Sequence, residues 1–120
     1  MISQDDVEHA LEFMRTNALP LARAKAERIY LEQFRKSKKA ILFSQAPESV
    51  GVGSDSRRAT IADRENYAYA DPEYIALLEG LKAAVEQEEH IKWKMNAAEL
   101  KVEVWRTQQA NARSIDAAHR

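Results

Sequence analysis

The sequence predicts an all-α fold, a long antiparallel helical hairpin similar to a coiled coil that assembles into a homo-oligomeric helical bundle. The chain has 120 residues but only three glycines and three prolines, which is too few for a sheet rich in turns. Apolar residues recur at helical spacing on both sides of one glycine- and serine-containing segment. After Pro72 only Gly80 interrupts the last predicted helix, whose length exceeds that of a compact globule. The total length fits one domain, residues 1–120.

The first helical segment begins near residue 3, where Ser3 and Asp6 form a variant of the capping box. Pro20 interrupts this segment, because proline has no N–H and its ring clashes with the carbonyl four residues earlier. Two alternatives follow: one long helix kinked near Asn17, or two helices over about 3–18 and 20–44 with Pro20 in the first turn of the second. The apolar positions of the segment are Val7, Leu11, Met14, Ala18 and Leu21, continued by Ala26, Tyr30, Phe34 and Ile41, with Leu31 and Leu42 beside them.

A flexible loop is expected over about 45–60, because this stretch carries Pro47, two glycines and several serines. Its Gly-Val-Gly sequence follows a helix and lacks the rest of a phosphate-binding fingerprint, so it does not predict a nucleotide site. Thr60 and Asp63 can cap a short helix over about 61–69. Asp71 followed by Pro72 then indicates the start of a long helix over about 72–113.

The long last helix carries two apolar stripes. The first is a heptad seam whose single charged member is Glu88: Leu77, Leu81, Ala84, Glu88, Ile91, Met95, Ala98, Val102, Trp105, Gln109 and Ala112. The second lies roughly opposite, at the same spacing: Trp93, Ala97, Leu100 and Val104.

A hairpin would cover one of these stripes and leave the other in water. Burying each large side chain of the second stripe is worth roughly 1.5–3 kcal/mol. The sequence therefore predicts that this stripe, together with Trp105, joins the subunits of a homo-oligomer. The alternative is that residues 1–43 wrap both faces within one monomer. A strand at Lys101–Trp105 (KVEVW), which alternates strictly, would have no turn or partner strand.

The composition excludes several kinds of chemistry. The chain has no cysteine, which rules out disulfides, thiolate zinc sites and a cysteine nucleophile. His9, His90 and His119 stand alone, and Gln87 occupies the place where a di-iron bundle would need a glutamate before His90. No serine has a nucleophile-elbow context. We therefore expect neither catalytic residues nor a metal or cofactor, and hence no enzyme.

The start of the chain has neither the basic nor the apolar region of a signal peptide, and no apolar run approaches the roughly 20 residues of a membrane span. We expect a soluble, cytoplasmic protein that does not contact a membrane.

Positive charge is concentrated in the middle of the chain. Residues 21–58 contain nine Lys and Arg against four Asp and Glu, a surplus of five, whereas both flanking parts are acidic. This pattern fits either a nucleic-acid patch or attraction between segments of the fold. The candidate phosphate-binding residues are Arg35, Lys36, Lys38, Lys39, Arg57 and Arg58.

Cations at a helix C-terminus also complement the helix dipole, which requires no ligand. As phosphate contacts these six residues would bind without reading bases, weakly per subunit and with strong salt dependence. Tyr67, Tyr69 and Tyr74 could stack on unpaired bases, although core packing is the commoner use of at least two of them. Oligomerisation would add avidity.

Several short motifs carry a resemblance: Ala62–Glu65 (ADRE), Asp71–Tyr74 (DPEY), Glu103–Arg106 (EVWR) and Asn111–Arg113 (NAR). With these motifs, residues 22–113 resemble small helical proteins that tailed bacteriophages encode among early genes of DNA recombination and single-strand annealing. The order of parts is also similar to that of the recombination mediator of T-even phages, a homo-oligomer that binds single-stranded DNA and loads a recombinase. No binding residue is carried over from either likeness.

The resemblance implies a phage-type accessory factor of DNA recombination or replication in the host cytoplasm. It would bind single-stranded DNA or the proteins that coat it, without catalysis, and its partners would include itself, single-stranded DNA and a recombinase or annealing protein. The alternative is a protein-interaction module, such as a phage inhibitor of a host nuclease or defence complex, which would use the apolar stripe and the acidic run 86–89.

Overall fold

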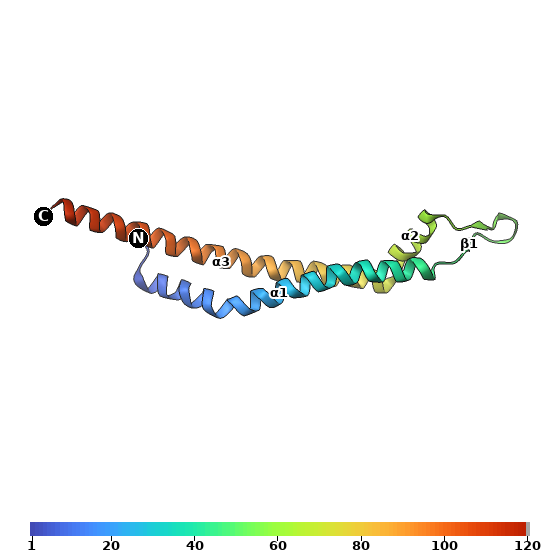
Figure 1. Ribbon diagram of the computed structural model, residues 1–120, viewed down its shortest axis with the longest axis horizontal. Helices are drawn as coiled ribbons and strands as arrows, with labels where there is room; N and C mark the ends of the chain where they lie inside the picture. The colour runs from blue at the N-terminus through green and yellow to red at the C-terminus, as the bar shows by residue number, and fades with distance from the viewer. Residues whose placement is uncertain (120) are drawn as a thin grey trace. The chain divides into compact units, whose positions relative to one another are not determined.

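The computed structural model describes residues 1–119. Helices make up 86% of the structure, which confirms the all-α prediction. The elements are α1 (Gln4–Gln45), β1 (Ser49–Val50), the 3₁₀ helix η1 (Gly53–Asp55), β2 (Arg57–Arg58), α2 (Ile61–Ala70) and α3 (Pro72–Ala118) (Figure 1). The chain divides into two compact units: unit 1 is Met1–Ala24 with Glu86–Arg120, and unit 2 is Lys25–Val85. That residues 1–120 form one domain, which unfolds cooperatively, stays a prediction.

The predicted cap at the start of α1 is confirmed. The Ser3 N–H donates to Asp6 Oδ2 at 3.0 Å, and the Asp6 N–H donates to Ser3 Oγ at 3.1 Å. These reciprocal bonds satisfy two N–H groups that have no partner within the helix. The bond from the Ser3 backbone, followed by that from its hydroxyl, lowers the pKa of Asp6.

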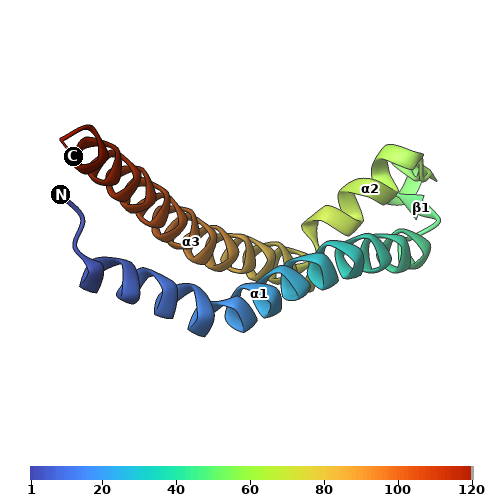
Figure 2. The ribbon, with the colours of Figure 1, turned by 60° about the vertical axis from the view of Figure 1, so that its left-hand side comes forward.

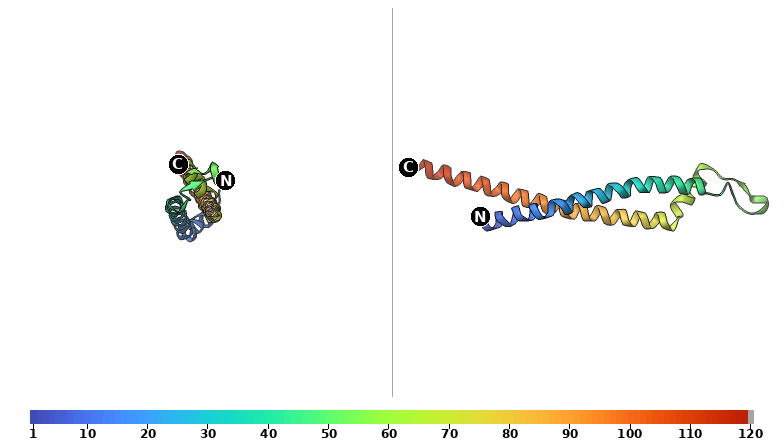
Figure 3. Two further views of the ribbon diagram at one scale, coloured as in Figure 1. Left: turned by 90° about the vertical axis from the view of Figure 1, so that its right-hand side faces the viewer. Right: turned by 60° about the horizontal axis from the view of Figure 1, so that its bottom comes forward.

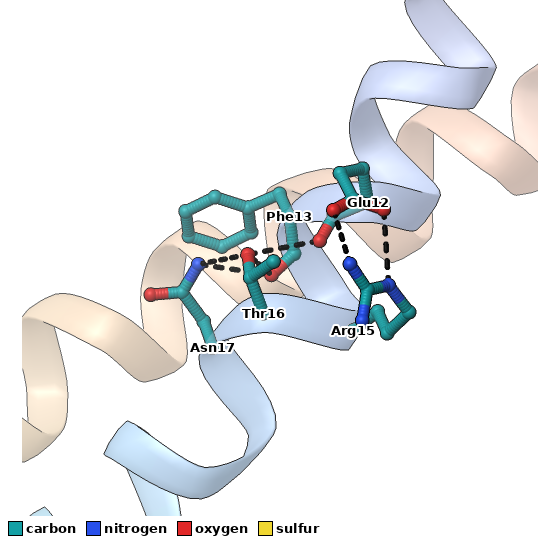
Figure 4. Close-up of polar contacts among 5 residues, drawn as sticks. All are labelled: Glu12, Phe13, Arg15, Thr16 and Asn17. Atoms are coloured by element: carbon teal, nitrogen blue, oxygen red, sulfur yellow. Dashed lines mark hydrogen bonds and ion pairs between the residues drawn. The ribbon is translucent and has the colours of Figure 1, made fainter.

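Pro20 lies inside α1 without ending it, so the alternative of two helices over 3–18 and 20–44 is wrong. In the turn before the proline, the Thr16 hydroxyl donates to the Glu12 carbonyl at 2.9 Å and the Asn17 side-chain amide donates to the Phe13 carbonyl at 2.9 Å (Figure 4). A proline in a helix interior costs about 3 kcal/mol. The helix continues through Pro20 because residues on both sides of the proline are packed. Asn17 before it is half-buried, and Ala24 after it is buried.

Unit 1 packs the first half of α1 against the last part of α3. Four of its buried residues form one cluster: Val7, Ala10, Ala98 and Val102. Near the N-terminus the Ile2 N–H donates to Gln108 Oε1 at 3.2 Å. Residue 2 thus meets residue 108 while Ala10 clusters with Ala98, so the two helices run antiparallel in this unit (Figure 3).

Unit 2 has a small core to which each helix contributes one residue: Leu42 from α1, Ala68 from α2 and Tyr74 from α3. The helix α2 runs beside the C-terminal end of α1 (Figure 2).

The apolar positions Ala26, Tyr30, Phe34 and Ile41 do not form the packed face of α1. All four are exposed, Tyr30 to 62%, which corrects the sequence interpretation. The buried and half-buried residues of α1 in unit 2 are instead the following: Arg28, Leu31, Glu32, Arg35, Lys38, Lys39, Leu42 and Phe43. Long charged side chains can occupy such positions because their methylene stems pack while their heads reach water or a partner.

The segment expected to be a flexible loop contains a short hairpin. β1 pairs antiparallel with β2, with Ser49 opposite Arg58. The Ala59 N–H donates to the Glu48 carbonyl at 2.8 Å and closes the base of the hairpin. Gly51 adopts φ +91° and Gly53 φ +60°, a backbone region that glycine enters without strain. The turn of the hairpin therefore depends on these two glycines, which had contributed to the prediction of a flexible loop.

Both caps predicted after the loop are confirmed. Thr60 and Asp63 form a full capping box at α2. Asp71 Oδ1 accepts from the N–H groups of Glu73 at 2.9 Å and Tyr74 at 3.2 Å, which caps the start of α3.

α3 runs to Ala118, beyond the predicted end at 113, and Lys101–Trp105 is helical as expected. Its predicted seam is buried or half-buried from Leu77 to Gln109, and only the last member, Ala112, is exposed. No helix within residues 1–119 combines the length and the apolar character that crossing a bilayer requires.

Candidate nucleic-acid interface

The six predicted phosphate-binding residues do not form one cluster. Three of them, Arg35, Lys36 and Lys39, converge on a hollow of about 200 Å³ in unit 2, which Tyr69 and Tyr74 complete. We call this hollow the basic hollow. None of its lining residues is acidic, although the charge of the nearby Glu65 also acts on Lys39.

Local structure explains why these residues meet. Arg35 and Lys39 are four residues apart on α1 and therefore lie on the same face of the helix, with Lys36 beside them. Tyr69 is in the last turn of α2 and Tyr74 is in the first turn of α3. Asp71 alone connects the two helices, so Tyr69 and Tyr74 lie close together. Their ring centroids are 5.7 Å apart, and the ring planes are tilted by 57°.

Lys39 lies against the Tyr69 ring. Its Nζ is 4.8 Å from the ring centroid, within the range of a cation–π contact. Hydrogen bonding to the Tyr69 hydroxyl raises the pKa of Lys39, so this lysine is a cation throughout the neutral range. Tyr69 is 45% exposed and Tyr67 41%, whereas Tyr74 is 5% exposed. Only one of the three tyrosines is therefore a core residue, fewer than the sequence suggested.

Lys38 and Arg57 are engaged within the fold. Lys38 Nζ forms an ion pair with Glu73, which raises the pKa of the lysine. Arg57 binds Asp63 through two bonds, of 2.6 Å and 3.0 Å. The Arg57 guanidinium first, and then the Thr60 backbone N–H, hold the pKa of Asp63 well below its usual range. For these two cations the structure supports attraction between segments of the fold.

Arg58 lines a separate, open hollow at the hairpin. Its other lining residues are Glu48, Ser49, Ser56, Arg57 and Arg64. Arg64 was not among the predicted residues because it follows the helix cap, outside the basic stretch; its guanidinium lies 5.8 Å from the Phe43 ring centroid. The carboxylate of Glu48 makes this hollow less favourable for an anion than the basic hollow.

The second apolar stripe of α3 is exposed in unit 1. Trp93 is 68% exposed and Leu100 65%, so the alternative in which residues 1–43 wrap both faces of α3 is wrong. Trp105 is half-buried and packs with the Val7 core, which places it on the seam instead of the stripe. Beside the stripe, a groove of about 300 Å³ lies between α3 and α1; its lining includes Ala97 and Phe13.

Comparison with protein-family models, with curated proteins and with solved structures finds no match to this chain. The likeness to phage recombination proteins therefore stays a prediction. Within residues 1–119, no three His, Asp or Glu side chains gather as a metal ion would require.

Proposed function

We propose that this protein is a non-catalytic accessory factor of DNA recombination or replication that binds single-stranded DNA at the basic hollow. The observation that carries the proposal is the convergence of Arg35, Lys36 and Lys39 with Tyr69 and Tyr74. Cations neutralise backbone phosphates, and aromatic rings give unpaired bases a surface for stacking. Both kinds of group stand together here without an acidic neighbour in the lining.

Arg35 and Lys36 would make the first phosphate contacts. Within residues 1–119 neither side chain takes part in an ion pair, so contacting a phosphate breaks no internal pair. Arg35 offers a planar fork that can donate two parallel bonds to one phosphate. Lys36 adds an exposed point charge one residue away.

Lys39 and Tyr69 would respond together. In the free protein the ammonium group occupies a face of the ring. When a phosphate draws Lys39 away, that face becomes free for a base, so one cation–π contact and one hydrogen bond to the Tyr69 hydroxyl are exchanged for one ion pair and one stacking contact. Because every base has a face that stacks, binding would not depend on sequence.

Salt dependence tests the phosphate contacts. Three contacts to a single strand, at about −0.7 each, predict a slope of about −2 in the logarithm of affinity against the logarithm of salt concentration. Fluorescence anisotropy with labelled oligothymidylate measures this slope. The triple variant R35A/K36A/K39A should bind weakly and with a nearly flat slope.

The matched control R15A/R106A/R113A removes three positive charges from exposed positions of unit 1. It should keep the slope and most of the affinity. Equal losses in both triple variants would mean that net charge alone matters and that the basic hollow is not the site. If the unaltered protein does not bind at low salt, the proposed function itself is wrong.

The stacking surface has its own matched pair. Tyr69→Ala should weaken binding by roughly 5- to 150-fold, since a base stacked on an aromatic ring contributes about 1–3 kcal/mol. Tyr69→Phe keeps the ring and should bind nearly normally. Tyr67→Ala removes an equally exposed tyrosine of α2 that does not line the hollow and should have no effect.

The second candidate function is a protein-interaction module, such as an inhibitor of a host nuclease or defence complex. The exposure of Trp93 and Leu100 favours it, because a large exposed apolar patch is typical of a protein-binding surface. A gel shift with single-stranded DNA separates the two functions: no shift at low salt supports this candidate.

A further inference from the structure

The exposed stripe of α3 consists of Trp93, Ala97, Leu100 and Val104, and it faces away from the core of unit 1. The neighbouring seam residues Ala98 and Val102 are buried against α1, whereas all four stripe residues are exposed. At 100° per residue Trp93, Leu100 and Val104 lie roughly opposite Ala98 and Val102. Ala97 lies at the edge of the stripe and also lines the groove towards α1. One side of α3 is therefore covered within the chain and the other is not.

We propose that a second copy of this chain covers the stripe, and that the two α3 helices pair in parallel and in register. The stripe residues are spaced by four, three and four, which is the spacing of a coiled-coil seam. In heptad letters Trp93 and Leu100 occupy d positions, and Ala97 and Val104 occupy a positions. The stripe is thus a second, independent seam on the same helix.

The charged residues beside the stripe decide the orientation. The g positions on one flank are Glu89, Asn96 and Glu103. The e positions on the other flank include Lys94 and Lys101. All five side chains are exposed, so one flank of the stripe is acidic and the other is basic.

In a parallel pair the g flank of each helix faces the e flank of the other, which brings Glu89 opposite Lys94 of the second copy. In an antiparallel pair g faces g and e faces e, so glutamates would face glutamates and lysines would face lysines. Like charges across an interface are unfavourable. Asn111 falls at an a position of the same heptad, and a polar residue at this position is a known way to fix the register of a parallel dimer.

Two exposed leucines of unit 1 provide a matched test of the surface. Leu100 lies on the stripe and is 65% exposed, whereas Leu19 on α1 is 58% exposed and lies off it. Sedimentation equilibrium over a range of concentrations should show a dimer for the unaltered protein. Leu100→Ala should weaken dimerisation at least tenfold, and Trp93→Ala should weaken it more, because buried aromatic residues dominate interfaces.

Leu19→Ala should dimerise normally. A monomer at every concentration in the unaltered protein overturns the proposal. Equal losses in Leu100→Ala and Leu19→Ala would also overturn it, because the contact would then not be confined to the stripe. Circular dichroism of each variant checks that the helices are intact. None of these measurements contains DNA, so their outcome is independent of the proposed function.

Disulfide cross-linking tests the orientation, and the absence of native cysteine makes single-cysteine variants clean. Thr107 is an exposed d position near one end of the stripe. In a parallel pair two Thr107→Cys chains bring their thiols together and should cross-link under mild oxidation. In an antiparallel pair residue 107 faces residue 90, so only a mixture of Thr107→Cys and His90→Cys would cross-link. Exclusive cross-linking in the mixture would refute the parallel arrangement.

Glu99→Cys is the matched control, because residue 99 is exposed but lies at a c position away from the stripe; it should stay monomeric on a non-reducing gel. Charge reversal gives a second readout. Lys94→Glu should weaken dimerisation about two- to fivefold, as expected for an exposed ion pair. The double variant Glu89→Lys/Lys94→Glu should restore it. A double variant weaker than the single one would contradict the parallel pairing of these flanks.

Discussion

Two neighbouring residues at the end of α1 test which face of this helix is packed. Leu42 is 4% exposed and belongs to the core of unit 2, whereas Ile41 is 49% exposed. Both are large aliphatic residues, and sequence periodicity alone placed Ile41 with the main apolar positions. We predict that Leu42→Ala destabilises the protein strongly and that Ile41→Ala does so weakly.

The structure sets the magnitudes. Replacing a buried leucine by alanine costs about 2–5 kcal/mol, depending on how far the site can close around the cavity. The Leu42 cluster has only three buried members, and no large side chain within residues 1–119 is fully buried. The surroundings can therefore relax, and we expect about 2–3 kcal/mol. For Ile41→Ala we expect at most about 1 kcal/mol, because half of the side chain is already in water and alanine favours helix.

Urea unfolding followed by far-UV circular dichroism at fixed protein concentration measures both free energies. Tryptophan fluorescence adds a local probe, because Trp93 and Trp105 both belong to unit 1 while Leu42 belongs to unit 2. If residues 1–120 form one cooperative domain, Leu42→Ala shifts both transitions equally. A shift in circular dichroism without a shift in fluorescence would mean that the units unfold separately.

The decisive comparison is between the two variants. If Ile41→Ala costs as much as Leu42→Ala, the face carrying Tyr30, Phe34 and Ile41 is buried in solution. In that case α1 would not turn its cations towards the core of unit 2.

Two further predictions concern the connection between α1 and α2. The pKa of Asp63 is lowered in the folded protein. Its bonds to Arg57 and Thr60 therefore contribute stability above the unfolded pKa of about 3.9, and this stability is lost as the pH falls below that value. Thermal unfolding between about pH 5 and pH 2 should show a shallower loss of stability in Asp63→Asn than in the unaltered protein, and an unchanged slope would contradict this. Gly51→Ala would place a Cβ 2.5 Å from the Asp55 carbonyl oxygen, whereas a Cβ on Gly53 meets nothing within 4 Å. Hydrogen exchange at the Ala59 amide should therefore accelerate much more in Gly51→Ala than in Gly53→Ala. Equal exchange rates in the two variants would argue against the hairpin.

The sequence allowed those parts of the fold to be predicted that local rules determine. The caps at Ser3, Thr60 and Asp71 each involve residues within a few positions of one another, so their geometry follows from the residue types. The seam of α3 could be identified for a similar reason, because its apolar members recur over many turns with a single charged exception, Glu88. The end of α3 was less well predicted, since no proline or glycine marks it.

The candidate site was harder to predict, because it depends on contacts between distant segments. Charge counting found all three cations of the basic hollow but could not separate them from Lys38, whose partner is 35 residues away. The ion pair of Arg57 was missed for a different reason: its partner Asp63 was already interpreted as a cap, and one carboxylate can serve both purposes. Asp63 and Glu73 thus neutralise two of the six predicted cations.

The rotation of α1 in unit 2 links the site to the stability of that unit. Helical periodicity alone allows either of two faces of α1 to be packed. The more apolar face, with Tyr30 and Phe34, points outward, where the two rings stack with their centroids 6.1 Å apart. The inward face brings Arg35 and Lys39 to α2 and α3, so the basic hollow exists only because apolar residues were turned away from the core. Each residue turned outward is one that the core lacks, and the buried residues of unit 2 are two large side chains, Leu42 and Tyr74, and three alanines, Ala46, Ala68 and Ala84. Tyr74 belongs to both the core and the hollow. The stability of unit 2 and the shape of the basic hollow therefore depend on the same residue, and a substitution that loosens the Leu42 cluster should also disturb the wall of the hollow.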